Sequence, residues 1–548
     1  MRSPHLICSC FLLYTIPRQI SPFYAYFRQK IIISYVLNFI LARRTAYDMI
    51  DFVLKILAEA RSALPERRLD WGNMKLKRYL SEHREFFMDI GRIGLPVALQ
   101  NLLTSTLSLV DSLMVGGLGS YALGAVGLAG QFSSLLYASY WGLASGGTMF
   151  FAQYWGSKDD KGLCRSYGLT MSSMMLVGFV FMILAVIFPQ AVMGVYTNDP
   201  EVQQIGAQYL RIIGLSYPLQ VLAMAISCLL RSTENVKVPL YASIGSVLTN
   251  TGLNYLLIGG HFGAPALGVS GAAIASLTAA GVNLMILLWF ALRDRKGYIR
   301  RLRDQFRWTR ALIKEYYVKC APIIANELLY GIGVLLINRV LGRQGADALA
   351  AVAIFRSIEG LIFAFFGGLA NASSVMIGKQ AGAGYLKEAY GDAKRLTLLC
   401  PMITLVVCVL VVCLREPILG LFSPTPATAE YVRAMLLIYM VAAPLRTCNY
   451  IQVNNFRAGG ETLLGAIFEI GGILLISAPI VNLTGLYLHW PFLLVFGSMY
   501  LEEVIKVFLE TFFTLKGKWL KPVTPEGQAA LDEFRRYLKK RHKREACA

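Results

Sequence analysis

Long apolar stretches follow one another along the chain and are separated by short polar loops. A helix of about 20 apolar residues is enough to cross the hydrocarbon core of a bilayer. The pattern between residues 91 and 516 therefore predicts an all-α polytopic membrane protein with twelve transmembrane helices. The predicted spans are 91–117, 124–153, 167–190, 205–230, 238–259, 268–292, 316–342, 350–379, 395–422, 429–456, 463–484 and 490–515.

The first span contains one acid, Asp111, in a run that carries no other charge after Arg92. An ionised carboxylate at the bilayer centre costs at least ~2.5 kcal/mol, so such an acid is a candidate for function. The alternative is an acid held by nearby hydroxyl groups, such as those of Ser108 and Thr104. Pro96 lies in the same span and predicts a kink. We hypothesise that a bend at Pro96 opens and closes the adjacent cavity when Asp111 is protonated or releases its cation.

Basic residues gather in alternate loops and at the two ends of the chain. There are 53 Lys and Arg against 33 Asp and Glu, a net charge of +20, with a mean hydropathy of +0.52. The linker after the sixth span is strongly basic, and Lys158, Arg231, Lys387 and Arg457 mark shorter loops, whereas 190–202 has almost no basic residue. The positive-inside rule then places both termini and the linker in the cytoplasm of a cell-membrane protein. Because the charges read as topology signals, nucleic acid is not an expected partner.

The two halves of the chain are copies of each other. A shift of 226 positions (322 − 96) superposes glycines, prolines and charged residues without a gap. Such a duplication predicts two pseudo-symmetric six-helix lobes, related by an axis along the membrane normal, with a cavity between them. The matched pairs include Pro96 and Pro322, Gly116 and Gly342, Gly119 and Gly345, Gly156 and Gly382, Pro218 and Pro444, and Arg231 and Arg457.

The expected organisation has five parts. They are an N-terminal extension (1–90), an N-lobe (91–292), a basic linker (293–315), a C-lobe (316–516) and a basic tail (517–548). Residues 1–73 are aromatic and apolar but are interrupted by prolines and arginines. They are interpreted either as a cytoplasmic or interfacial amphipathic segment or as residues upstream of a translation start at Met74.

Nothing in the sequence indicates an enzyme. The ten cysteines are scattered, mostly inside apolar stretches, without the paired spacing of metal ligands. No paired His/Asp motif and no phosphate loop in a strand-to-helix setting is present. We expect no cofactor apart from a transported Na⁺ or H⁺. The expected partners are small molecules and the lipid bilayer, and the chain is expected to be a monomer.

Several short motifs recur through the spans and loops. They are LPVALQ and VDSLMVG in the first span, AQYWGSKDDKG and its second copy GKQAGAGYLKEA, MGVYTNDPEV, LRSTENVKVPL, NTGLNYLLI and GVSGAAIAS. Together these motifs resemble the multidrug and toxic compound extrusion (MATE) family, in its bacterial branch similar to NorM and DinF. The resemblance covers residues 85–516 and implies export of organic cations or other amphipathic compounds, driven by inward Na⁺ or H⁺.

The resemblance also implies a cation site formed by Asp111, Asn250, Asn254 and Ser276. Asn250 and Asn254 are one helical turn apart, and amide oxygens with one carboxylate suit a hard cation such as Na⁺. If Na⁺ is the coupling ion, Asp111 and Asn254 are its predicted ligands. Some family members have a second acid where this chain has Asn254, and others have an acid in the tenth span that this chain lacks. The resemblance therefore does not decide whether Na⁺ or H⁺ is the coupling ion.

The second half contains its own intramembrane charges. Glu327 resembles a family acid implicated in substrate or proton binding, and Glu359 is a second candidate for that role. Simple ion pairs are the alternative, with Arg356 and Glu359 spaced i, i+3, and Glu502 and Lys506 spaced i, i+4. Glu469 and Glu503 complete the set.

Three other functions compete with drug export. A flippase of lipid-linked saccharides would require cationic side chains in the cavity to meet a pyrophosphate, and the spans of the first half have almost none. A membrane-embedded transferase would require the catalytic motifs that are missing. A solute channel would not require an ion gradient.

Overall fold

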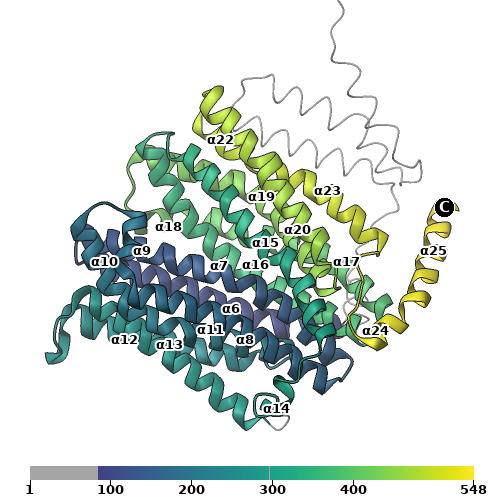
Figure 1. Cartoon of the computed structure of the whole chain (residues 1–548). Coiled ribbons are helices and arrows are strands. Elements are labelled where there is room, and N and C mark those ends of the chain that lie inside the picture. Colours follow the sequence, from purple (N-terminus) through teal and green to yellow (C-terminus); the bar gives the residue numbers. More distant parts are fainter. Residues whose placement is uncertain (1–83, 295–296, 548) are drawn as a thin grey trace, which may run out of the picture. The chain divides into compact units, whose positions relative to one another are not determined.

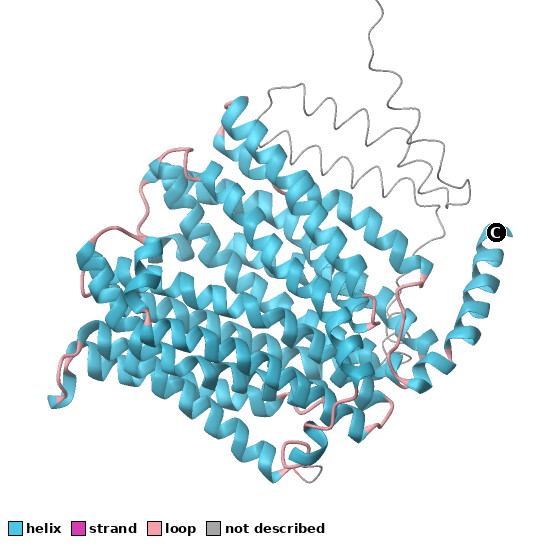
Figure 2. Ribbon diagram, in the orientation of Figure 1, coloured by secondary structure: helices cyan, strands magenta, loops and turns pink. Residues whose placement is uncertain are grey.

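The computed structural model describes residues 84–294 and 297–547. Within them the chain forms helices joined by short loops, and no strand is present (Figures 1 and 2). The interpretations of residues 1–73 lie outside the described residues. The all-helical fold predicted from the hydrophobic pattern is confirmed.

The first half contains a helix for each of its six predicted spans. Three spans have short extra elements: α9, which begins at Pro189, follows the third span, η3 divides the fourth, and η4 follows the fifth. The elements are α6 (Arg84–Gly116), α7 (Ser120–Gly156), α8 (Asp160–Ile187), α9 (Pro189–Tyr196), α10 (Pro200–Ile213), η3 (Gly214–Ser216), α11 (Tyr217–Ser232), α12 (Lys237–Gly259), η4 (His261–Gly263) and α13 (Gly268–Arg293).

The second half repeats this order, and its eleventh span changes to π-helical winding twice. The elements are α14 (Leu302–Gln305), α15 (Arg310–Leu341), α16 (Ala346–Gly382), α17 (Leu386–Cys413), α18 (Arg415–Phe422), α19 (Pro426–Ala458), α20 (Thr462–Gly471), η5 (Gly472–Ser477), α21 (Ala478–Asn482), η6 (Leu483–Tyr487), α22 (Phe492–Ser498), α23 (Leu501–Lys516), α24 (Pro525–Ala529) and α25 (Leu531–Cys547).

Eight helical segments of the described part are long and apolar enough to cross a membrane by length and composition alone. The four remaining predicted spans correspond to α6, α7, α12 and the pair α22–α23. Three of these four carry buried or half-buried polar residues that are described below: Asp111 on α6, Asn250 and Asn254 on α12, and Glu502, Glu503 and Lys506 on α23. Intramembrane polar residues normally face the protein interior rather than lipid.

Helix starts repeat between the halves. Gly119 precedes α7 with φ 107°, and Gly345 precedes α16 with φ 104°, in the positive-φ region that glycine adopts without strain. The two positions differ by the same 226 residues as the other matched pairs. Side-chain caps support other starts: the Asp159 carboxylate accepts the backbone N–H groups of Lys161 and Gly162 at the start of α8.

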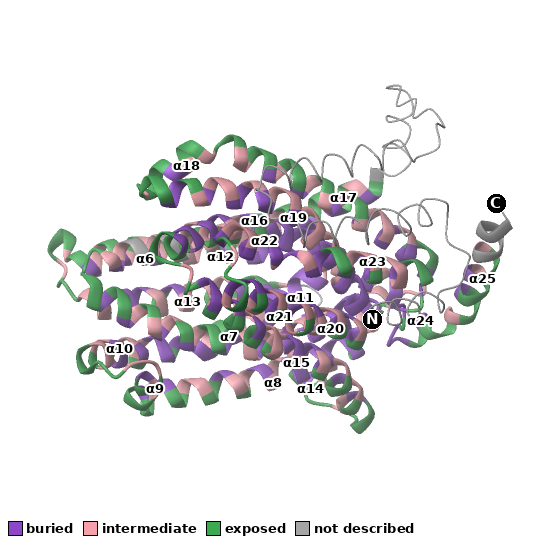
Figure 3. Ribbon diagram, turned by 90° about the horizontal axis from the view of Figure 1, so that it is seen from above, coloured by how far each residue is buried: buried purple, intermediate pink, exposed green. Residues whose placement is uncertain are grey.

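The two halves pack together through symmetry-related helix pairs, α6 with α16 and α7 with α15. Glycines permit the close approach. A Cβ on Gly368 would lie 2.5 Å from the Cα of Ala98, and one on Gly142 would lie 2.8 Å from the Cα of Ile324. Buried residues gather in the middle of the helical core and exposed residues on its outer elements (Figure 3). The predicted two-lobe arrangement is therefore confirmed, and its interface is built from small residues.

The linker and the first part of the tail both pack against the helical core. In the linker, the Tyr298 hydroxyl donates to Asp160 Oδ1 over 2.8 Å, and burial raises the pKa of Tyr298. In the tail, the Val523 N–H donates to Gln153 Oε1 over 2.7 Å, and the Thr524 hydroxyl donates to the Gly382 carbonyl over 2.7 Å. The tail residues just after α23 thus contact both halves.

Candidate functional site

Three helices of the first half bring the four predicted cation-site residues together. Asp111 lies on α6, Asn250 and Asn254 on α12, and Ser276 on α13. The Asn254 amide donates to Asp111 Oδ1 over 2.6 Å and to Asn250 Oδ1 over 2.8 Å, and the Asn250 amide donates to the Ser276 hydroxyl over 3.1 Å. One continuous hydrogen-bonded chain therefore joins residues that are up to 165 positions apart (276 − 111).

The Asp111 carboxylate has no cationic partner among the described residues. Asn250 and Asn254 are almost fully buried, and the Asn254 Oδ1 atom is buried without a hydrogen bond. A buried oxygen without a donor is unfavourable unless a further group fills the site. The alternative partner Ser108 lies among the side chains outside the described part of the structure. The arrangement of one carboxylate, two amide oxygens and a hydroxyl is of the kind that hard cations bind.

An apolar layer covers one side of this site. Val115, Ile258 and Ala272 form a buried cluster on the same three helices, and Tyr209 of α10 packs against it. A water-poor surround strengthens electrostatic interactions at the carboxylate. Binding of a cation or a proton to Asp111 is therefore expected to change the electrostatic energy of the site strongly.

Pro96 lies inside α6, fifteen residues before Asp111, and the helix continues through it. The neighbouring Gly94 and Ala98 contact α16, through Leu369 and Gly368 respectively. A bend of α6 at Pro96 would therefore change the contacts between the two halves. Its role as a gating kink stays a prediction.

A pocket of about 30 Å³ lies between the two halves. Residues at equivalent positions of the two repeats line it from both halves: Ser145 and Asn371, Thr148 and Ser374, Arg231 and Arg457. Both arginines are buried, with 6% and 5% exposure. Both were predicted to mark loops, but each lies in the last turn of a helix, α11 or α19, and its side chain is buried. A count of basic residues near loops does not show which way the last turn of a helix points.

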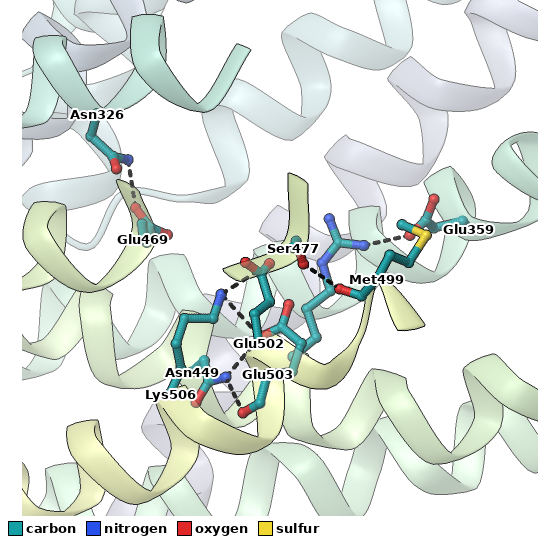
Figure 4. Close-up of polar contacts among 10 residues, drawn as sticks. Asn326, Glu359, Asn449, Glu469, Ser477, Met499, Glu502, Glu503 and Lys506 are labelled. Carbon is teal, nitrogen blue, oxygen red and sulfur yellow. Dashed lines mark hydrogen bonds and ion pairs between the residues drawn. The ribbon is translucent and has the colours of Figure 1, made fainter. Parts of the chain in front are cut away.

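Glu327 belongs to a charged group beside this pocket. Arg457 forms an ion pair with Glu469 over 2.7 Å, and Glu327 lies 3.8 Å from the same guanidinium. The Asn326 amide also donates to Glu469, over 2.5 Å (Figure 4). Glu327 is thus placed next to the cavity lining, where a role in substrate or proton binding would require it.

The family model MatE matches residues 96–256 and 322–483, which together make up more than half of the chain and cover both repeats. The chain belongs to the MatE family. It is 24% identical over 451 residues to a Thermotoga maritima protein named "Probable multidrug resistance protein NorM", covering 81% of this chain and 96% of that protein. It is 22% identical over 413 residues to "Uncharacterized transporter YisQ" of Bacillus subtilis, covering 75% and 90%.

Solved MATE structures share the fold. A mutant of the Vibrio cholerae MATE transporter VcmN superposes with a TM-score of 0.72 at 16% identity, covering 80% of this chain and 98% of that one. The resemblance identified from the motifs is therefore confirmed, and the chain is a multi-pass membrane protein of this transporter family.

The second candidate acid of this MatE chain, Glu359, lies elsewhere in its half. Its carboxylate forms an ion pair with Arg446 of α19. The neighbouring Arg356 instead donates to the Asn338 side chain. The predicted pair between Arg356 and Glu359 is therefore wrong, because helical spacing reveals partners on the same helix and not those on another.

A third group of charges lies along α23 (Figure 4). The Lys506 ammonium lies 3.5 Å from Glu502 and 3.1 Å from Glu503, and the Asn449 amide donates to Glu503 over 2.7 Å. The predicted pair of Glu502 and Lys506 is confirmed. Glu510, one turn further along, is fully buried and neither of its carboxylate oxygens has a hydrogen bond.

Sequence reasoning did not single out two features: the pocket with its paired arginines and the buried Glu510. The signals were present, because Arg231 and Arg457 superpose in the repeat, and Glu502, Lys506 and Glu510 recur every four residues on one helix face. The sequence did not show that these side chains are buried.

Proposed function

We propose that this MatE protein is a secondary active exporter that moves amphipathic compounds, organic cations among them, out of the cell in exchange for Na⁺ or H⁺. The observation that carries the proposal is the Asp111 site. A partly buried carboxylate with amide and hydroxyl neighbours and no cationic partner among the described residues requires a mobile cation or proton. The name of the Thermotoga relative supports drug efflux as the transported activity.

In the proposed cycle the outward-facing state binds the ion at Asp111 with Asn250 and Asn254. Ion binding favours a conformation with weaker affinity for substrate, so the substrate leaves. The ion-loaded carrier then returns and exchanges the ion for a new substrate, and the two ligands compete through one conformational equilibrium. Pro96 is the proposed hinge, because it lies on the Asp111 helix beside the contacts with α16.

The remaining assignments follow from this role. We place the protein in the cell membrane as a monomer, with both termini and the linker on the cytoplasmic side, in accordance with the basic loops. Its partners are small molecules and lipid, without nucleic acid, and its chemistry is transport rather than catalysis. The transported ion is its sole inorganic ligand.

A flippase of lipid-linked saccharides is the second candidate. The observation that favours it is the pocket with Arg231 and Arg457, since this function requires cationic side chains in the cavity. Only one of the two arginines is without a carboxylate partner among the described residues, which is less charge than a pyrophosphate would require. Drug export therefore remains the preferred proposal.

The test is efflux from proteoliposomes with a Na⁺ gradient and a pH gradient imposed separately. We expect one of the gradients to drive export of a fluorescent amphipathic dye, and Asp111→Asn to abolish the response to it. Asp532→Asn, an exposed carboxylate in the tail, is the matched control. If neither gradient drives export by the folded protein, or if Asp111→Asn keeps full ion dependence, the proposal fails.

A further inference from the structure

The two arginines of the pocket occupy equivalent positions but have different surroundings. Arg457 is neutralised by Glu469 at 2.7 Å and has Glu327 at 3.8 Å. Arg231 touches two sulfur atoms, with the Cys228 Sγ at 3.4 Å and the Met224 Sδ at 3.8 Å. Among residues 84–294 and 297–547 it has no carboxylate within ion-pair distance.

A comparison of the two repeats shows which residues stand around each arginine. Shifting by 226 positions, Glu469 of the second half corresponds to Ser243 of the first, and Glu327 corresponds to Asn101. Both acids that surround the second arginine are thus neutral residues around the first. Glu234, three positions after Arg231, is engaged with Lys379 at 2.5 Å. The first half therefore has the cation without either of these acidic partners.

A buried charge without a counter-ion is unfavourable, and thiol and thioether sulfurs are weak acceptors. Arg231 is 6% exposed, so bulk water does not solvate it well. The planar guanidinium is suited to bind a carboxylate or a phosphate through two parallel hydrogen bonds. A ligand with an anionic group would supply the missing partner.

The shape and lining of the pocket fit such a group. The pocket, about 30 Å³ in volume, has room for a group as small as a carboxylate. Trp141 and Tyr450 offer aromatic surface, and Thr148, Ser374 and Asn371 offer polar groups around the arginine. The body of an amphipathic ligand would extend along the interface when the two halves separate.

From this geometry we infer that the pocket is an anion-recognition subsite, in which Arg231 binds the carboxylate or phosphate group of an amphipathic substrate. The inference rests on the proposed export function and refines its substrate class. Zwitterions and amphiphilic anions are then substrates in addition to organic cations. Arg457 lines the subsite but does not bind the anion, because Glu469 neutralises its charge.

Binding of a matched pair of dyes tests the subsite directly. A rhodamine with a free carboxylate and its methyl ester differ by the anionic group alone. We expect Arg231→Gln to weaken binding of the carboxylate dye by roughly tenfold to hundredfold, as for the loss of a hydrogen bond to a charged group. Binding of the ester is expected to change less than about twofold, and Arg231→Lys to retain part of the affinity, because lysine keeps the charge without the bidentate fork.

Two controls keep the test decisive. Arg301→Gln removes a surface arginine whose partner is the exposed Asp160, and should affect neither dye. Thermal unfolding of each purified variant shows whether it is folded, and Arg231→Lys replaces Arg231→Gln if the latter is not. Equal weakening of both dyes, or an unchanged affinity for the carboxylate dye in a folded Arg231→Gln variant, would overturn the inference.

Competition experiments determine whether the subsite prefers a phosphate or a carboxylate group. A short-chain phosphatidate and a short-chain fatty acid are added as unlabelled competitors of the carboxylate dye. Displacement by either one supports the subsite and identifies the preferred head group, whereas displacement by neither contradicts it. If the carboxylate dye binds in an Arg231-dependent manner but no gradient moves it, the subsite stands and the export function fails. If gradients move both dyes equally in wild type and Arg231→Gln, the export function stands and the subsite fails.

Discussion

The two repeats place acids in the membrane in opposite ways. In the first, Asp111 is surrounded by amide and hydroxyl groups, and no cationic side chain of the described residues neutralises it. In the second, Glu359, Glu469 and Glu503 are each beside an arginine or a lysine. The first half thus has a negative charge without a cationic side chain beside it, which we propose an external ion balances, whereas the second half balances most of its charges internally.

The comparison predicts that removal of a C-lobe cation has the largest effect on stability. Lys506→Met leaves Glu502 and Glu503 buried without their shared partner, and breaking such a pair typically costs ~3–5 kcal/mol. We expect a strongly lowered midpoint of thermal unfolding for the purified protein. Lys516→Met, near the exposed end of the same helix, is the control. Unfolding of Lys506→Met at the wild-type temperature would show that this cluster contributes little to the fold.

The interhelical pair of Arg446 and Glu359 should behave as a unit. Arg446→Met and Glu359→Met are each expected to destabilise the protein, and the double variant less than their sum, with a coupling energy of about 0.5–3 kcal/mol. Chemical unfolding of the four proteins in a double-mutant cycle measures this coupling. If the effects add, Glu359 is available for substrate or proton binding after all.

In the first half, substitution of a ligand should impair ion binding while the fold stays stable. Asn254→Ala removes the amide that joins Asp111 to Asn250, and changes around ion ligands typically lower affinity roughly 10–100-fold. The ion concentration that gives half-maximal export measures the loss. Asn235→Ala, an exposed amide in the loop before α12, is the matched control. An unchanged ion requirement in Asn254→Ala would exclude Asn254 from the site.

The smallest effect is expected at Glu510. Its carboxylate makes no hydrogen bond. Glutamine has nearly the same shape but avoids the desolvation cost of a buried carboxylate. We expect Glu510→Gln to change the free energy of unfolding by less than about 1 kcal/mol and to leave ion-driven export intact. Loss of ion coupling in a stable Glu510→Gln protein would reveal a second ion site in the C-lobe and weaken the contrast between the halves.

The sequence was sufficient to predict the architecture and the grouping of Asp111 with Asn250 and Asn254, whereas their role in ion binding stays a prediction. Apolar runs predicted the helices, and the repeat predicted the two lobes. The Asp111 site was predictable because Asn250 and Asn254 lie one turn apart on one helix face and the family motifs align them with Asp111. Residue spacing along a helix and internal repeats can both be recognised from the sequence alone.

Partners across helices were not predictable in the same way. Glu359 binds Arg446, 87 positions away, rather than Arg356 on its own helix. The burial of Arg231 depends on how α11 packs between α8, α13 and α7, which no local pattern describes. Charge counts treat every basic residue near a loop alike, and packing decides which of them turn inward.

The most direct test of the contrast between the halves is the movement of the ion itself. In proteoliposomes, an imposed substrate gradient should drive Na⁺ or H⁺ in the opposite direction, measured with radioactive Na⁺ or a pH-sensitive dye. We predict counter-movement of one ion by wild type and by Glu510→Gln, and none by Asp111→Asn at equal substrate binding. Undiminished counter-movement of the ion in Asp111→Asn would contradict the assignment of ion coupling to the first half.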